Sequence, residues 1–122
     1  MNDIYQEELR EIYKNPTNKG QITNPSVSIH HKNPMCGDEL DLQLKVEDGV
    51  IVDAKFQGSL CAVSIISSDI LLDNIIGKKI SDAKNVSKDE LLEWLHMNLT
   101  TSRISCATLV LSALQKALKN YE

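Results

Sequence analysis

Residues 39–46 alternate strictly between polar and apolar side chains, and this segment constrains the fold more than any other part of the chain. A period of two places alternate side chains on opposite faces of a strand, so the segment predicts a half-buried antiparallel β-strand. Asp48-Gly49 follows it and is typical of a tight hairpin turn. We therefore expect residues 50–56 to return beside the first strand. The buried face is expected to carry Leu40, Leu42, Leu44 and Val46 on one strand and Val52, Ala54 and Phe56 on the other.

A weaker alternation at Val27, Ile29 and His31 predicts a third strand and hence a three-stranded meander. Before it, apolar residues at helical spacing predict an N-terminal helix, capped by Asn2 or Asp3, that stops at Asn15-Pro16. One face of that helix is expected to carry Tyr5, Leu9, Ile12 and Tyr13.

The remaining helices are expected after the sheet. Residues 61–76 are apolar on most sides and predict a long buried helix that Gly77 ends. Ser87 and Glu90 have the spacing of a capping box, which predicts the start of another helix. Residues 98–103 are polar and are expected to lead to a long last helix that opens at Cys106. The expected fold class is α+β, a three-stranded antiparallel sheet packed against several helices, in a single domain of residues 1–122.

Charge and hydropathy exclude several classes of function. The net charge is −4 and the basic residues are scattered, which argues against a nucleic-acid surface. No apolar run reaches the roughly 18 residues of a membrane span, and the N-terminus is polar and acidic, unlike a targeting peptide. Three cysteines are an odd number, whereas secreted disulfide frameworks use even sets. We therefore expect a cytoplasmic protein with free or metal-bound thiols.

The three cysteines all lie at expected element boundaries. Cys36 precedes Gly37-Asp38 at the entry to the central strand, while Cys61 and Cys106 open apolar helical runs. The start of a helix favours the thiolate, which is the form that binds metal or attacks sulfur. Gly37 allows a tight turn, so Cys36 and Asp38 can point into one site.

Three thiolates and one carboxylate can bind either of two cofactors. They complete a tetrahedral Zn²⁺ site, and they can also hold a small iron–sulfur cluster with one ligand that is not cysteine. An oxygen ligand holds such a cluster more weakly than a fourth thiolate, which suits a site that releases its cargo. The cysteine separations of 25 and 45 residues match no zinc finger, so the reading of Cys61 and Cys106 as buried core residues stays open at this point.

The chain resembles the U-type iron–sulfur cluster assembly scaffolds, the family of IscU, SufU and the N-terminal domain of NifU. The resemblance runs from about Tyr5 to Leu118. It is carried by these segments in order: Asn15-Pro16-Thr17-Asn18-Lys19-Gly20, Asn33-Pro34-Met35-Cys36-Gly37-Asp38, the alternating strand and its hairpin, Asp53-Ala54-Lys55-Phe56-Gln57-Gly58-Ser59-Leu60-Cys61, the serines Ser64, Ser67 and Ser68, and Cys106.

The resemblance implies a SufE/NifU-like fold and Cys36, Asp38, Cys61 and Cys106 as ligands of a transient [2Fe–2S] cluster or of Zn²⁺ in the same site. It implies sulfur transfer from a PLP-dependent cysteine desulfurase, with Cys106 as the persulfide acceptor, and cluster delivery to apo iron–sulfur proteins. The protein would then be a scaffold rather than an enzyme in its own right.

Two departures distinguish this chain from IscU-type members. Ser105 stands where they have histidine, and residues 99–103 replace their Leu-Pro-Pro-Val-Lys motif, which argues against handover by an Hsp70-type chaperone. Arg103, three residues before Cys106, instead resembles an arginine with which SufU-type members engage the desulfurase. The insertion of roughly twenty residues that SufU-type members usually carry before the third cysteine is absent.

Three hypotheses follow from these features. The first is a cluster scaffold, and the second is a zinc-dependent sulfurtransferase that activates the desulfurase without holding a cluster. The third is a structural zinc domain that serves only as an interaction module. His30, His31 and His96 are expected on the surface, outside the metal site.

Overall fold

The computed structural model describes residues 3–34, 37–96 and 99–121. Their order is α1 (Asp3–Lys14), β1 (Val27–Asn33), β2 (Asp38–Glu47), β3 (Val50–Ser59), α2 (Ala62–Ile75), α3 (Ile80–Lys84), α4 (Lys88–Leu95), α5 (Thr101–Ala107) and α6 (Leu109–Tyr121). The strands form one antiparallel sheet in the order β1-β2-β3. The α+β class and the three-stranded meander are therefore confirmed.

The central strand β2 alternates as its sequence predicts, with Leu40, Leu42 and Leu44 fully buried. The return strand differs from expectation near the hairpin. A bulge between Lys45 and Val46 shifts the register, so Val46 pairs with Ile51. Ile51 is consequently buried, whereas Val52 is 41% exposed, and the prediction that Val52 shares a face with Ala54 and Phe56 was wrong. An extra residue in one strand reverses which side chains beyond it face the core.

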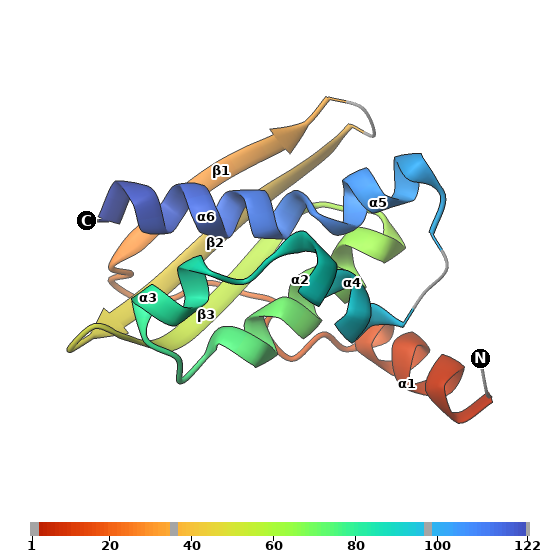
Figure 1. The fold of residues 1–122 in the computed structure, drawn as a ribbon, viewed down its shortest axis with the longest axis horizontal. Coiled ribbons are helices and arrows are strands. Elements are labelled where there is room, and N and C mark those ends of the chain that lie inside the picture. Colours follow the sequence, from red (N-terminus) through yellow and green to blue (C-terminus); the bar gives the residue numbers. More distant parts are fainter. Residues whose placement is uncertain (1–2, 35–36, 97–98, 122) are drawn as a thin grey trace.

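The helices cover one face of the sheet (Figure 1). α6 crosses β1 and β2, while α2 packs on β3 and also contacts α4, α5 and α6. The apolar residues of α2, α4 and α6 form one buried core with those of the sheet. α2 is apolar on most of its circumference because it is enclosed in this way, as its sequence predicts.

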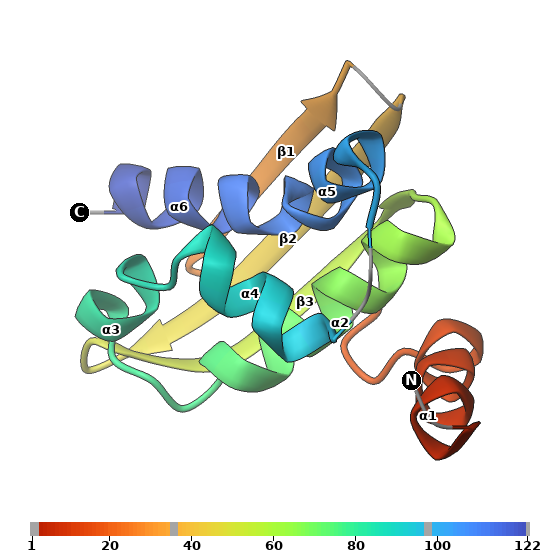
Figure 2. The same ribbon diagram turned by 45° about the vertical axis from the view of Figure 1, so that its right-hand side comes forward.

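α1 packs against α2 and lies at the end of the molecule away from the C-terminus (Figure 2). Leu9 is buried, but Tyr13 is 48% exposed, so the expected apolar face is covered only in part. The side chain of Tyr5 lies outside the described residues. The segment after α1 is fixed by Asn18, whose backbone N–H donates to Asp69 Oδ1 at 2.8 Å and whose side chain donates to Asp73 Oδ1 at 2.8 Å.

α4 begins as predicted, with a complete capping box between Ser87 and Glu90. α3, of five residues, was not predicted. The largest correction concerns the last helices. The segment expected to be a connection becomes helical at Thr101, so Cys106 lies in the last turn of α5 and does not open a helix.

The break between α5 and α6 falls at Thr108, where φ is −93° and ψ is 0°. The Thr108 hydroxyl donates to the carbonyl of Ile104 at 2.9 Å. A threonine that bonds back to the preceding turn bends a helix. The expected long C-terminal helix is therefore divided in two, and Cys106 sits just before the bend.

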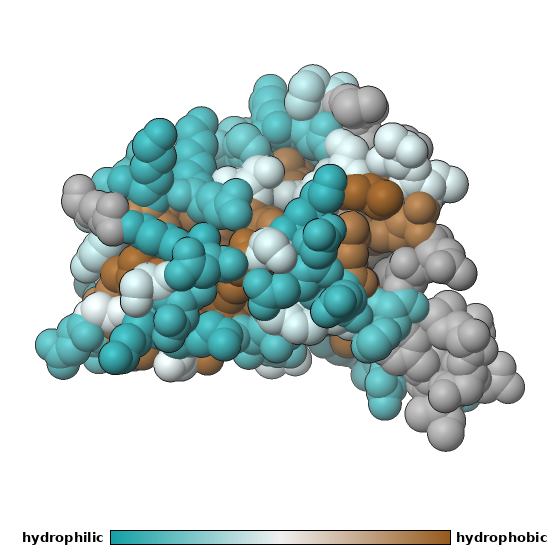
Figure 3. All heavy atoms as spheres, viewed as in Figure 1, coloured by the Kyte–Doolittle hydropathy of each residue, from teal (hydrophilic) through white to brown (hydrophobic). Residues whose placement is uncertain are grey.

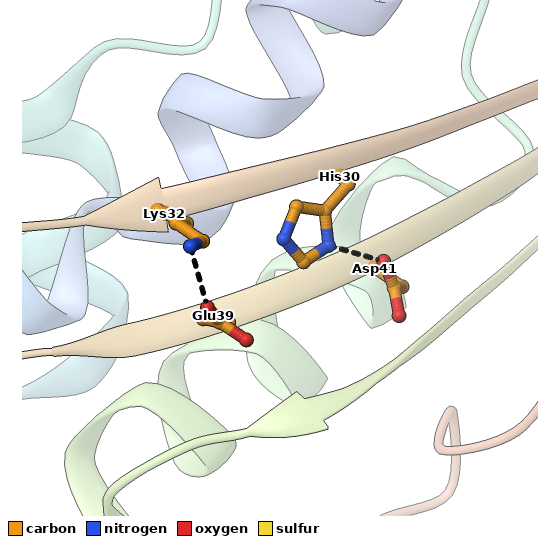
Figure 4. Close-up of polar contacts among 4 residues, drawn as sticks. All are labelled: His30, Lys32, Glu39 and Asp41. Atoms are coloured by element: carbon orange, nitrogen blue, oxygen red, sulfur yellow. Dashed lines mark hydrogen bonds and ion pairs between the residues drawn. The ribbon is translucent and has the colours of Figure 1, made fainter.

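The other face of the sheet carries polar side chains (Figure 4). His30 Nδ1 lies 2.6 Å from Asp41 Oδ1, and Lys32 Nζ lies 3.0 Å from Glu39 Oε1, both across the β1–β2 ladder. His30 is exposed, as expected of a surface histidine.

On the helical face, hydrophilic side chains predominate, with hydrophobic atoms gathered over α5 and the start of α2 (Figure 3). None of the helices in the described residues combines the length and apolar character that crossing a bilayer requires.

Candidate metal centre

The fold brings three of the predicted site residues together from three different elements. Asp38 opens β2, Cys61 is the N-cap of α2, and Cys106 lies in the last turn of α5. One ligand atom from each, a carboxylate oxygen or a sulfur, lies within 4.8 Å of the other two. Asp38 and Cys106 are buried, whereas Cys61 is partly exposed, so solvent reaches this group beside Cys61.

Asp38 is held by the start of α2. Its Oδ2 accepts the backbone N–H of Cys61 at 3.2 Å and the hydroxyl of Ser64 at 2.6 Å. The first N–H groups of a helix have no partner within the helix and favour a negative charge nearby. These two donors stabilise the negative charge of the buried carboxylate at this position.

Two serines one turn apart on α2 bind the end of α5. The hydroxyl of Ser64 lies 3.0 Å from the carbonyl of Cys106, and that of Ser67 donates to the carbonyl of Ala107. The last carbonyls of a helix need partners outside it, and buried ones are costly when left without them. Ser67 therefore supplies a partner for the carbonyl of Ala107, and Ser64 lies between Asp38 and the carbonyl of Cys106.

Asn33 fixes the same segment from the sheet side. Its amide donates to Ser105 Oγ at 2.7 Å and to the Ser105 carbonyl at 3.1 Å. Its own backbone carbonyl accepts the N–H of Gly37 at 2.8 Å. Asn33 thus connects Ser105, the residue before Cys106, with Gly37, the residue before Asp38.

The donor set fits a tetrahedral metal ion. Zinc binds thiolate at about 2.3 Å and carboxylate oxygen at about 2.0–2.2 Å, so its ligand atoms lie roughly 3.5–3.8 Å apart. The three atoms here, all within 4.8 Å of one another, need to close by only a fraction of that separation. Two sulfurs and one oxygen would leave a fourth position for another ligand.

Of the other predicted residues, Cys36 lies outside the described residues. Arg103 is exposed on α5, one turn before Cys106, and its backbone N–H is capped by Thr100 Oγ1 at 3.4 Å. None of the three histidines joins the ligand group within the described part of the chain. His96 is exposed and ends α4 with φ of 51°.

His31 is partly buried, whereas the sequence predicted a surface position. It lines a cavity of about 340 Å³ with Asn33, Ser105 and Thr108. Burial, followed by the charges of Lys116 and His30, holds the pKa of His31 below its ordinary value. The His31 side chain therefore borders the segment that carries Cys106.

The contacts of Ser64, Asn33 and Ser105 were not anticipated as parts of the site. Ser64 could have been found from its spacing, because the third residue after an N-cap cysteine points back toward that cysteine. The bond between Asn33 and Ser105 joins residues 72 apart in sequence and has no local signal.

Known proteins with similar sequences agree with the family resemblance that the sequence motifs indicate. The sequence profile of the NifU-like N terminal domain matches residues 4–122. The zinc-dependent sulfurtransferase SufU of Bacillus subtilis is 32% identical over 139 residues, covering 100% of this chain and 94% of that protein. The iron-sulfur cluster assembly scaffold protein IscU of Thermotoga maritima is 32% identical over 132 residues, covering 95% of this chain and 93% of that protein.

The three-dimensional comparison agrees as well. The crystal structure of FiSufU from Fervidobacterium islandicum AW-1 superposes with a TM-score of 0.76 at 27% identity, covering 94% of this chain and 96% of that one. The chain thus shares its overall architecture with that protein at detectable sequence identity. This chain belongs to the NifU-like N-terminal domain family.

Proposed function

We propose that this chain, as one domain of residues 1–122, is an iron–sulfur cluster assembly scaffold. The observation that carries the proposal is the meeting of Asp38, Cys61 and Cys106, with ligand atoms within 4.8 Å, in a chain whose family profile covers residues 4–122. The relative in Thermotoga maritima is named as such a scaffold and has similar length. Cys36, two residues before Asp38 in the sequence, is proposed as the remaining ligand.

Sulfur would enter at Cys106. Its thiolate attacks the outer sulfur of a persulfide on a PLP-dependent cysteine desulfurase, the donor's S–S bond breaks, and the donor thiolate leaves. Two transferred sulfurs need four electrons to become sulfide. Two Fe²⁺ ions that become Fe³⁺ supply two of these, and an external reductant supplies the other two.

Asp38 is proposed as the ligand that lets the cargo go. A carboxylate is a harder ligand than a thiolate and binds iron of a cluster less strongly than a fourth cysteine. The cluster is then passed to apo iron–sulfur proteins. The protein itself would catalyse no turnover beyond accepting and relaying sulfur, in a reducing compartment such as the cytoplasm, where its thiols stay available.

Anaerobic reconstitution tests this proposal. The chain is incubated with Fe²⁺, cysteine, a cysteine desulfurase and dithiothreitol, and the visible absorption of a [2Fe–2S] cluster is recorded. Cys36→Ser, Cys61→Ser and Cys106→Ser are each expected to lose the absorption, whereas Asp38→Ala is expected to retain the cluster for longer than wild type. A colourless product that keeps stoichiometric zinc would rule out the scaffold.

The second candidate is a zinc-dependent sulfurtransferase that activates a desulfurase without holding a cluster. The relative in Bacillus subtilis, which aligns with the whole of this chain, is named a zinc-dependent sulfurtransferase. Arg103 is exposed one helical turn before Cys106, where a partner can reach it. This function predicts tightly bound zinc and strong stimulation of desulfurase turnover. Arg103→Ala should lower that stimulation while leaving zinc bound, and an undiminished rate would exclude a docking role for Arg103.

A structural zinc module would behave differently from both. It would bind zinc but take no sulfur from the desulfurase, and Asp38→Ala would simply weaken the zinc site. Mass spectrometry of Cys106 after exposure to a desulfurase and cysteine distinguishes this case, because a persulfide adds one sulfur atom to the chain.

A further inference from the structure

Ser64 contacts all three of the described ligand residues. Its side chain is buried, with 1% of the residue exposed. Its Oγ lies 2.6 Å from Asp38 Oδ2, 3.0 Å from the Cys106 carbonyl and 3.5 Å from Cys61 Sγ. We infer that Ser64 is a positioning residue that orients the Asp38 carboxylate toward a metal ion, an inference that rests on the metal site of the proposed function.

The hydroxyl has one proton and two oxygen acceptors within reach. A carboxylate is the stronger acceptor, and the contact to Asp38 is the shorter one, so the proton is directed at Asp38 Oδ2. This bond is kept when the carboxylate binds a metal ion, so Ser64 orients the ligand in the bound state.

The same Oδ2 also accepts the N–H of Cys61. Two donors that approach one oxygen from α2 fix the plane of the carboxylate and the direction of its lone pairs. Without the Ser64 hydroxyl, Oδ2 loses the shorter of these two bonds, and the carboxylate is oriented less firmly. Loss of a group that orients a metal ligand lowers metal affinity by about 10–100-fold.

Titration with Zn²⁺ against a competing chelator tests the inference. We expect Ser64→Ala to weaken Zn²⁺ binding by about 10–100-fold. Ser67→Ala is the matched control because Ser67 is a buried serine of the same helix that also bonds to an α5 carbonyl. It does not bond to Asp38, so its Zn²⁺ affinity should stay within about twofold of wild type.

A double-mutant cycle with Asp38→Ala separates orientation from packing. If Ser64 acts through the carboxylate, Ser64→Ala changes affinity by no more than about twofold once Asp38 is gone. An equal loss in both backgrounds means that Ser64 only supports the local structure, and the inference is wrong.

If Ser64→Ala does not fold, Ser64→Thr and Ser64→Val replace it, since these two side chains have the same shape and differ in the hydroxyl. The Ser64→Thr protein should then bind Zn²⁺ about 10–100-fold more tightly than the Ser64→Val protein. Equal affinities of these two variants would overturn the inference. The assay needs only this chain and Zn²⁺. Failure of wild type to bind Zn²⁺ refutes the metal site and the inference together, whereas unchanged binding by Ser64→Ala refutes the inference and leaves the proposed function standing.

Discussion

Gly58→Ala should damage both the stability of the protein and its metal site. Gly58 pairs with Leu40 across the β2–β3 ladder and has φ of +145°, a conformation that side-chain-bearing residues rarely adopt. A Cβ built there lies 2.1 Å from the carbonyl oxygen of Glu39 and 3.0 Å from its carbonyl carbon. Strands β2 and β3 therefore approach each other at Gly58 more closely than a residue with a Cβ atom would allow.

The magnitude follows from two costs. Holding alanine in this backbone region costs about 1–3 kcal/mol. Real Cβ contacts under 3.0 Å are essentially unknown, so the Glu39 backbone must move by roughly 0.9 Å to relieve a contact of 2.1 Å. Forcing extra volume into a well-packed region costs about 1–3 kcal/mol. Together they reduce the free energy of unfolding by about 2–6 kcal/mol, a large share of the roughly 5–15 kcal/mol of a typical domain.

The displacement is expected to reach the metal centre. Glu39 directly follows Asp38, and Gly58 lies three residues before Cys61, so a shift of these strands separates two proposed ligands. Gly49→Ala is the control, because Gly49 also has positive φ, +76°, but its Cβ would meet nothing within 4 Å. It should cost only about 1–2 kcal/mol and leave metal binding unchanged.

Urea denaturation followed by circular dichroism measures the stability of both variants, and chelator competition measures their Zn²⁺ affinity. Gly58→Ala should shift the unfolding midpoint further than Gly49→Ala and should bind Zn²⁺ more weakly. Equal midpoints, or a Gly58→Ala protein that binds Zn²⁺ like wild type, would refute the reasoning.

Three further predictions concern two contacts between distant segments. Asp69→Ala should lower the free energy of unfolding by about 1–3 kcal/mol, because the buried N–H of Asn18 loses its acceptor; unchanged urea denaturation would contradict this. Burial is the largest cause that raises the pKa of Asp69. The folded state therefore holds this proton to higher pH than the unfolded state does. As a result, the contribution of Asp69 to the free energy of unfolding falls as pH rises above about 4. Asp69→Asn should remove that fall, which unfolding midpoints measured across the acid range will check. Asn33→Ala loses bonds to both the hydroxyl and the carbonyl of Ser105 and should cost about 1–3 kcal/mol, whereas Ser105→Ala keeps the carbonyl bond and should cost about half as much. Equal unfolding temperatures of these two variants would show that the hydrogen bond from Asn33 to the Ser105 carbonyl contributes nothing to stability.

The helices and strands with strong local patterns were predictable. The alternation of β2, the Asp48-Gly49 hairpin and the capping box at Ser87 all depend on neighbours a few residues apart, and each is confirmed. The bulge at Lys45/Val46 was missed because the sequence of β3 permits either Ile51 or Val52 to face the core. The choice between them comes from the pairing with β2 and from packing beneath it.

The start of α5 was missed for a similar reason. Residues 99–103 are polar and short of helical periodicity, so they resemble a connection. In the structure Thr100 caps a helix there, and Thr108 bends it away from α6. The expectation that a helix N-terminus favours a thiolate therefore applies to Cys61 but not to Cys106, whose carbonyl instead lies against Ser64.

The sequence by itself determined the α+β class, the order of the strands and the residue types of the proposed metal site, because periodicity, turn residues and motifs are local properties of the chain. Only the tertiary structure decided that Asp38, Cys61 and Cys106 lie within 4.8 Å of one another and that Ser64 bonds to Asp38. These contacts depend on how α2 packs between the sheet and α5. That packing is a collective result of core shape, and no short segment of the sequence records it.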